Sequence, residues 1–138
     1  MQDYSYLSTP FLAWLVAGCS KFAINTIKAR KLALAQIGYG GLPSNHSAIV
    51  SSMAALIFFK EGLGHPAFGV AVALCFIVML DANSLRQKIG EQAAMINQLT
   101  ADTQGPKLRE RMGHTKLEIA AGIIVGSLTA WCVTLLPF

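Results

Sequence analysis

The chain has 138 residues, of which 54% are hydrophobic and only 13% are charged, and its formal net charge is +4. Soluble domains carry about 25% charged residues, so the composition excludes a water-soluble globule. The length excludes a large extramembrane domain beside about four spans of roughly 20 residues each. Nucleic-acid binding is excluded because the lysines and arginines stand between apolar segments instead of clustering on a soluble face. We therefore expect a single membrane-embedded domain over residues 1–138.

Four apolar stretches follow one another along the chain, and each approaches the length of a membrane span. They occupy residues 10–27, 44–59, 66–80 and 117–136. These stretches predict an all-α integral membrane protein, a compact bundle of about four transmembrane helices. The cysteines Cys19, Cys75 and Cys132 are scattered within apolar sequence, and we expect them to pack as small hydrophobic side chains.

A polar segment, residues 81–116, separates the third stretch from the fourth. Apolar side chains recur within it at spacings of three and four residues, at Leu85, Ile89, Ala93, Ile96 and Leu99. This period predicts an amphipathic helix that lies at the membrane interface or against the bundle. The sequence Thr-Gln-Gly-Pro-Lys at residues 103–107 ends that helix.

The positions of the cations predict the orientation of the bundle. If the first span runs from outside to inside, the inner side receives Lys28, Arg30, Lys31, Arg86, Lys88, Lys107, Arg109, Arg111 and Lys116. The other side receives only Lys60. This bias predicts that both termini lie outside and that the basic loops face the cytoplasm, or its equivalent in an organelle. The chain is then expected in a bacterial inner membrane or an organellar membrane.

Two lysines of the first span share one helix face. Lys21 and Lys28 are about two helical turns apart, and Asn25 lies between them on nearly the same stripe. Lys28 is explained as a cation at the end of a span. Lys21 lies inside the span, where an ionisable group is costly and usually faces a polar interior or a functional cavity. The alternative is a tilted or short helix that lets Lys21 reach water.

A glycine-rich loop over residues 38–47 precedes the second span. Glycines let the backbone approach a ligand closely, and Pro43 followed by Ser44 is typical of a helix start. The free N–H groups at such a start can bind an anion, and His46 could donate a proton to a leaving oxygen. The alternative is a capped turn with a surface histidine.

A histidine and a carboxylate stand at the mouth of the fourth span. His114 and Glu118 are four residues apart, so on a helix the carboxylate can hold one imidazole nitrogen and leave the other free to attack. Such pairs also occur on ordinary interfacial helices. Arg86, five residues after Asp81, adds a candidate phosphate ligand, and Asp81 is expected to pair with it or to cap a span. His65 falls on the opposite side and is interpreted as a loop residue.

These motifs resemble those of the type 2 phosphatidic acid phosphatase superfamily, which includes the vanadium-dependent haloperoxidases. Pro43-Ser44-Asn45-His46 resembles its P-S-G-H motif, Lys21-x6-Lys28 resembles K-x6-R, and His114-x3-Glu118 resembles H-x3-D. Longer strings at residues 40–48, 81–93 and 113–118 are similar to the divergent bacterial and plant branch of acid phosphatase/haloperoxidase-related proteins. The resemblance covers about residues 18–126. The chain departs from the superfamily pattern at Lys28, Asn45 and Glu118, and it lacks the S-R pair that precedes the histidine.

The resemblance implies a role for each residue. His114 would be the nucleophile on phosphorus, oriented by Glu118, and His46 would protonate the leaving oxygen. The phosphate would be held by Lys21, Lys28, Ser44 and Arg86, with Asn25, Asn45 and Asp81 in support. No metal ion and no cofactor is expected, because fixed cations and backbone donors would stabilise the transition state.

The sequence therefore predicts a membrane phosphatase that hydrolyses a lipid-linked phosphate or pyrophosphate, of a polyprenyl or glycerolipid species, through a phosphohistidine. The candidate partners are this lipid phosphate and the surrounding membrane lipids, with a second copy of the chain as a further candidate. One alternative is a noncatalytic membrane protein that binds or translocates an anionic lipid or phosphate. A weaker alternative is haloperoxidase chemistry in a vanadate-binding pocket.

Overall fold

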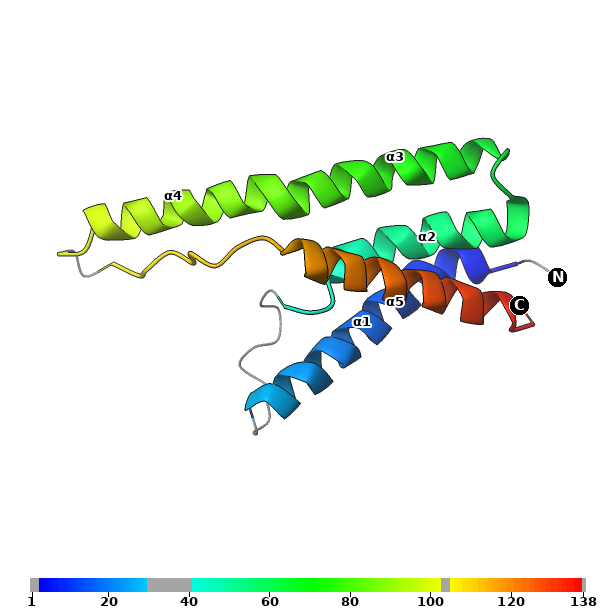
Figure 1. The fold of residues 1–138 in the computed structure, drawn as a ribbon, viewed down its shortest axis with the longest axis horizontal. Helices are drawn as coiled ribbons and strands as arrows, with labels where there is room; N and C mark the ends of the chain where they lie inside the picture. The colour runs from blue at the N-terminus through cyan, green and yellow to red at the C-terminus, as the bar shows by residue number, and fades with distance from the viewer. Residues whose placement is uncertain (1–2, 30–40, 103–104, 138) are drawn as a thin grey trace.

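The computed structural model describes residues 3–29, 41–102 and 105–137, and these residues form an all-helical bundle (Figure 1). Its elements are α1 (Ser5–Ala29), α2 (Asn45–Glu61), α3 (Pro66–Leu80), a π-helical turn η2 (Asp81–Leu85), α4 (Arg86–Leu99) and α5 (Lys116–Thr134). Each predicted span falls on a helix. The first helix begins five residues earlier than predicted, because the Asp3 carboxylate accepts the backbone N–H of Ser5 and caps the helix there.

The helix lengths support an integral membrane protein. Among the described residues, three helical segments are long and apolar enough to cross a bilayer: Ser5–Lys28, Pro66–Leu99 and Lys116–Thr134. The helix α2 has 17 residues, which is at the short end of the range for a span. A membrane-embedded helical bundle is therefore confirmed, whereas a count of four crossing helices stays a prediction.

The helix α2 lies at the centre of the bundle, where α1, α3 and α5 pack around it. Its contact with α5 is the closest, because Gly122 and Gly126 of α5 face the first turns of α2. A Cβ atom at Gly122 would lie 2.5 Å from the carbonyl oxygen of Ser44, and one at Gly126 would overlap the carbonyl oxygen of Ala48. Two glycines four residues apart thus let the two backbones approach each other.

The buried face of α1 is a stripe of small residues that ends in a lysine. Its buried residues recur every four positions at Ser5, Thr9, Ala13, Ala17 and Lys21. Side chains at this spacing lie on one face of a helix. The stripe that brings α1 against its neighbours therefore also turns Lys21 inward, where it is 9% exposed.

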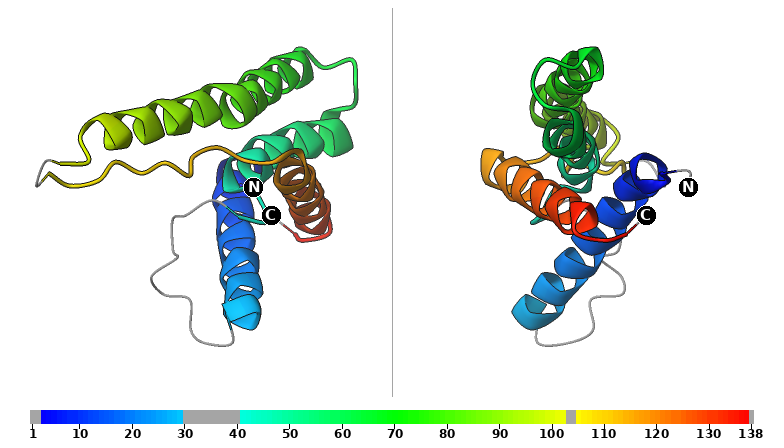
Figure 2. Two further views of the ribbon diagram at one scale, coloured as in Figure 1. Left: turned by 60° about the vertical axis from the view of Figure 1, so that its left-hand side comes forward. Right: turned by 90° about the vertical axis from the view of Figure 1, so that its right-hand side faces the viewer.

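The helix α4 continues α3 through η2 in nearly the same direction and extends beyond the bundle (Figures 1 and 2). The predicted helix exists, but its apolar side chains do not pack against the bundle: Ala93 is buried, whereas Leu85, Ile89, Ile96 and Leu99 are exposed. The reason is local, because no glycine or proline interrupts residues 81–89 and the helix does not turn. The continuous segment has 34 residues and is about 50 Å long.

The chain returns toward the bundle beside α4. Asn97 pairs with Leu108, donating from Nδ2 to the Leu108 carbonyl and accepting the Leu108 N–H at Oδ1, both at 2.8 Å. Gly90 makes room for this segment, since a Cβ atom there would overlap the carbonyl oxygen of Glu110. The returning segment delivers residues 113–115 to the start of α5.

Both termini lie at one end of the bundle, and the starts of α2 and α5 lie at the other (Figure 1). At the terminal end, Lys60 Nζ and Asp3 Oδ2 form an ion pair at 2.6 Å, and the Tyr6 hydroxyl donates to Glu61 at 2.6 Å. The lysine lowers the pKa of Asp3 to about 2, chiefly through its hydrogen bond. Which end faces the cytoplasm stays a prediction from the cation count.

Candidate active site

The candidate active site lies where α2 and α5 begin, beside η2 and the inner face of α1. The two helix starts are joined directly, because the backbone N–H of Ser44 donates to the carbonyl of Glu118 at 2.9 Å. This bond fixes the motif around His46 next to the motif around His114. The close approach at Gly122, one turn further along α5, makes the bond geometrically accessible.

The π-helical turn positions the backbone of His114. The N–H of Arg86 donates to the carbonyl of Asp81 rather than to that of Ala82, its partner in a regular α-helix. The carbonyl of Ala82 is thereby released and accepts the N–H of His114 at 2.9 Å. The side chain of Gln87 donates to the carbonyl of His114 at 3.4 Å. His114 is held on both of its backbone groups and is 7% exposed.

Gly113 is required immediately before this histidine. Its φ is +86°, in the region that favours glycine. A Cβ atom there would lie 2.9 Å from Cγ of Gln87 and 3.2 Å from the carbonyl oxygen of Ala82. The tight turn at Gly113 therefore lets the chain dock against the π-helical turn.

Glu118 contacts His114 through a helix cap. Thr115 caps α5, accepting the N–H of Glu118, and the Glu118 carboxylate folds back to accept the N–H of Thr115 at 3.0 Å. The same carboxylate oxygen lies 3.2 Å from Nδ1 of His114. The four-residue spacing predicted that both residues lie on one helix, which is wrong for His114, because α5 begins after it. The contact exists because the capping box directs the carboxylate backward.

His46 stands in the first turn of α2 and faces His114. The centroids of the two rings are 6.2 Å apart, with a 56° angle between the ring planes. His46 is exposed, whereas His114 is buried. This arrangement leaves Nε2 of His114, which has no hydrogen bond to any described residue, on the site side of a ring anchored through Nδ1.

Burial lowers the pKa of His114, and the positive charges of Lys21 and Arg86 lower this pKa further. The Glu118 carboxylate opposes them and raises the pKa. Because burial is the largest effect, His114 is neutral at pH 7. A neutral imidazole is the form that can act as a nucleophile.

Arg86 is held from one side only. Its Nε donates to Oδ2 of Asp81 at 2.8 Å, so the expected pairing of these two residues occurs, and both side chains are about one-third exposed. The two Nη groups of Arg86 make no bond to described residues and keep their donors for an anion. Burial lowers the pKa of His46, and the positive charges of Arg86 and Lys21 lower this pKa further, whereas the Asp81 carboxylate raises it.

Four residues that were predicted to bind or support the phosphate form no hydrogen bond with His46, His114 or Arg86 in the described part of the chain. Lys28 is exposed and makes no bond with any described residue. Ser44 is fully buried and caps α2, accepting from the N–H and the hydroxyl of Ser47. Asn25 Oδ1 would lie 3.9 Å from a Cβ atom at Gly41, and the buried Asn45 Oδ1 has no hydrogen-bond partner among the described residues. Residues 30–40, which include Arg30, Lys31 and the first glycines of the predicted anion loop, lie outside the described residues.

Three contributors were not singled out from the sequence: the Ala82 carbonyl, the Gln87 side chain and Gly113. Ala82 and Gly113 stand inside the strings at residues 81–93 and 113–118. Ala82 acts through its backbone carbonyl and Gly113 through its backbone φ angle. Neither role can be inferred from the chemistry of a side chain. The signal in the sequence was that each string has a small residue next to a titratable one: Ala82 follows Asp81, and Gly113 precedes His114.

Comparisons with known proteins show which family the chain belongs to. The divergent PAP2 family matches residues 3–129 of the chain. YuiD, an uncharacterized membrane protein of Bacillus subtilis strain 168, is 31% identical over 140 residues, which cover 88% of this chain and 89% of YuiD. No solved structure gives a significant match. The resemblance seen in the histidine and lysine motifs is thus confirmed, and the chain belongs to the divergent PAP2 family of membrane proteins.

Proposed function

We propose that the chain is a membrane phosphatase that hydrolyses a lipid-linked phosphate or pyrophosphate, without a metal ion, through a phosphohistidine at His114. The observation that carries this proposal is the His114 ring, buried, held at Nδ1 by Glu118 and facing His46 at 6.2 Å. Lys21 and Arg86 supply the positive charge around it. This is the arrangement of an oriented nucleophile, a proton donor and fixed cations.

The first step forms a bond between Nε2 of His114 and phosphorus. The bond from phosphorus to the leaving oxygen breaks, and its electron pair stays on that oxygen. Protonated His46 gives its proton to the leaving oxygen, which departs as an alcohol or as a lipid monophosphate. Glu118 stabilises the positive charge that develops on the imidazole, and Lys21 and Arg86 stabilise the equatorial oxygens of the transition state.

The second step restores the enzyme. Water attacks phosphorus, its proton passes to His46, and the bond from phosphorus to Nε2 breaks to release inorganic phosphate. His46 is then protonated and His114 neutral, as at the start. Burial and the positive charge of Arg86 lower the pKa of His46 in the free protein. A bound phosphate dianion would raise this pKa, so the exposed His46 takes up its proton from solvent when the substrate binds, whereas the buried His114 stays neutral.

Phosphate release from purified protein tests the proposal. Lipid monophosphates and diphosphates are offered in the presence of EDTA, and metal-independent release from at least one of them is expected. We expect His46→Ala to lower kcat/KM about 10²-fold for a lipid phosphate, whose alkoxide needs a proton. The same variant should retain most of its kcat/KM on nitrophenyl phosphate, whose leaving group needs no proton. Its kcat on that substrate should fall, because His46 also takes the proton of the attacking water.

His65→Asn is the matched control for this experiment. His65 lies at the opposite end of the bundle and accepts the N–H of Ala67 as the cap of α3, and asparagine keeps that cap. Its kinetics should equal those of the unaltered chain. If folded protein releases no phosphate from any substrate but binds lipid phosphates, the noncatalytic alternative is correct.

The pH dependence tests the role of Glu118. Glu118→Gln removes the negative charge that raises the pKa of His114, so the acid limb of kcat/KM should move to lower pH. The maximal rate should also fall about tenfold to a hundredfold, because the imidazole is less well oriented. Glutamine preserves the capping box, so the helix start is retained.

The exposed carboxylate of Glu91 on α4, paired with Lys88, provides the control. Glu91→Gln should change neither the acid limb nor the maximal rate. A Glu118→Gln profile that keeps its acid limb and loses only rate would contradict an electrostatic contact between Glu118 and His114.

A further inference from the structure

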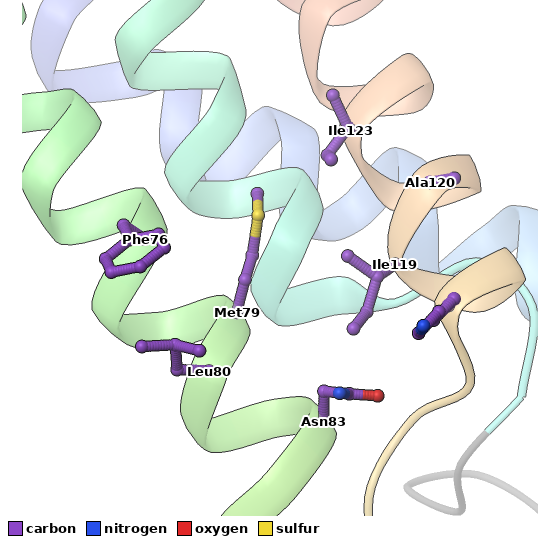
Figure 3. A pocket seen from close by; sticks show the side chains of 8 residues that line it. Phe76, Met79, Leu80, Asn83, Ile119, Ala120 and Ile123 are labelled. Atoms are coloured by element: carbon purple, nitrogen blue, oxygen red, sulfur yellow. The ribbon is translucent and has the colours of Figure 1, made fainter.

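A groove with a volume of about 310 Å³ lies between α3 and α5 (Figure 3). Both helices pack on α2 rather than on each other, which leaves the space between them open. One wall carries Phe76, Met79 and Leu80 of α3, and the other carries Ile119, Ala120 and Ile123 of α5. The volume is at the lower end of the range for sites that bind small molecules.

The groove has one polar end, next to the candidate active site. Its polar lining residues are Asn83 and Lys116. Asn83 belongs to η2, between Asp81 and Arg86, and its amide points toward the start of α5 in Figure 3. Lys116 is the first residue of α5, two positions after His114. The groove therefore begins at the elements that hold His114 and continues between apolar side chains.

The apolar part of the groove runs along two membrane-spanning helices. From Asn83 it passes Leu80 and Phe76 on α3, and from Lys116 it passes Ile119 and Ile123 on α5. Leu80 and Phe76 are exposed on the outside of the bundle, so the groove opens to the side, toward lipid. A molecule can enter it without leaving the bilayer.

We propose that this groove binds the hydrocarbon chain next to the phosphate of the lipid whose phosphate reaches His114. This inference rests on the proposed function, because it names where the substrate of that site lies. The polarity of the groove matches such a molecule, with Lys116 and Asn83 at the anionic end and aliphatic or aromatic side chains along the chain. The groove would thus make the chain attached to phosphate a determinant of specificity.

Substitution of Ala120 by phenylalanine tests the inference through kinetics. Ala120→Phe fills the groove from α5, and we expect it to lower kcat/KM for hexadecyl phosphate in nanodiscs about tenfold or more. The kcat/KM for butyl phosphate, whose chain is too short to fill the groove, should change less than twofold. Leu128→Phe, on the same helix but outside the groove and exposed, should affect neither substrate. An equal loss on both substrates, or a loss on neither, would overturn the inference.

Photolabelling separates this inference from the proposed phosphatase activity. An alkyl phosphate with a diazirine near the phosphate should label the peptides of α3 and α5, and unlabelled hexadecyl phosphate should compete with it. Ala120→Phe should abolish that labelling, whereas a diazirine phosphatidylcholine should label every lipid-facing helix without competition. Competed labelling without phosphate release would disprove the phosphatase and retain the groove as a lipid-phosphate site. Phosphate release together with labelling that hexadecyl phosphate does not reduce would show that the groove contacts bulk lipid only. That result would disprove the groove as a binding site for the substrate chain.

Discussion

Replacement of His114 by alanine is expected to lower phosphate release at least about 10⁴-fold for every substrate, including nitrophenyl phosphate. The reason is that, in the proposed mechanism, Nε2 of His114 forms the bond to phosphorus, and alanine offers no nucleophile in its place. The variant should fold, because the bonds that position residue 114 involve its backbone N–H and carbonyl, which alanine keeps. Loss of activity in this variant would therefore report the chemistry of the imidazole.

The measurement combines phosphate release with trapping of the intermediate. Rapid acid-free quenching of the unaltered chain with a radiolabelled lipid phosphate should yield acid-labile label on the peptide that contains His114. His114→Ala should give no such label. His46→Ala should accumulate label from radiolabelled nitrophenyl phosphate, because His46 takes the proton of the attacking water. Label on a different residue, or full phosphate release by His114→Ala, would show that His114 is not the nucleophile.

Replacement of Gly122 by alanine is expected to have the second-largest effect. The added Cβ atom would lie 2.5 Å from the carbonyl oxygen of Ser44 and 2.8 Å from Cβ of Ser47. Neither the backbone carbonyl nor the short side chain can move away freely, so α5 must shift from α2. Overpacking of this kind costs about 1–3 kcal/mol, and a shift of about 1 Å at a catalytic site can lower activity about 10²-fold.

The chain offers a matched glycine for this experiment. Gly69 lies in α3, and a Cβ atom built there would meet no heavy atom within 4 Å. Gly69→Ala should therefore leave activity unchanged and keep or raise the midpoint of thermal unfolding. Gly122→Ala should lower both quantities in the same detergent. If the two variants behave alike, the contact between the starts of α2 and α5 does not hold the site together.

The helices of this protein are largely predictable from sequence because their cause is local. Runs of apolar residues of the right length mark α2, α3 and α5 to within two residues. The short spacing along the chain also predicts the contact between His114 and Glu118. The cause of that contact differs from the predicted one, because a capping box and not a continuous helix brings the two side chains together. The beginning of α1 was missed because Asp3 caps the helix upstream of the apolar run.

The continuation of α3 into α4 was not predictable from periodicity. The change from uniformly apolar to amphipathic sequence at Asp81 suggested a new element. The backbone instead passes through one π-helical turn and continues in the same direction. Hydropathy reports which surroundings a helix face prefers, whereas a sharp turn is favoured by a glycine or proline, and residues 81–89 contain neither. The π-helical turn releases the carbonyl of Ala82 but does not redirect the helix.

The sequence by itself determined the fold class, the family and the inventory of the candidate site, because these depend on the types of residue and on their spacing within single helices. Only the tertiary structure decided which members of that inventory meet. It brings Lys21, Arg86 and His46 toward His114, leaves Lys28 exposed and makes Ser44 a buried helix cap. The physical reason is that the contacts between these side chains depend on how closely the backbones of different helices approach one another. That approach is set at Gly122, Gly126 and the released carbonyl of Ala82.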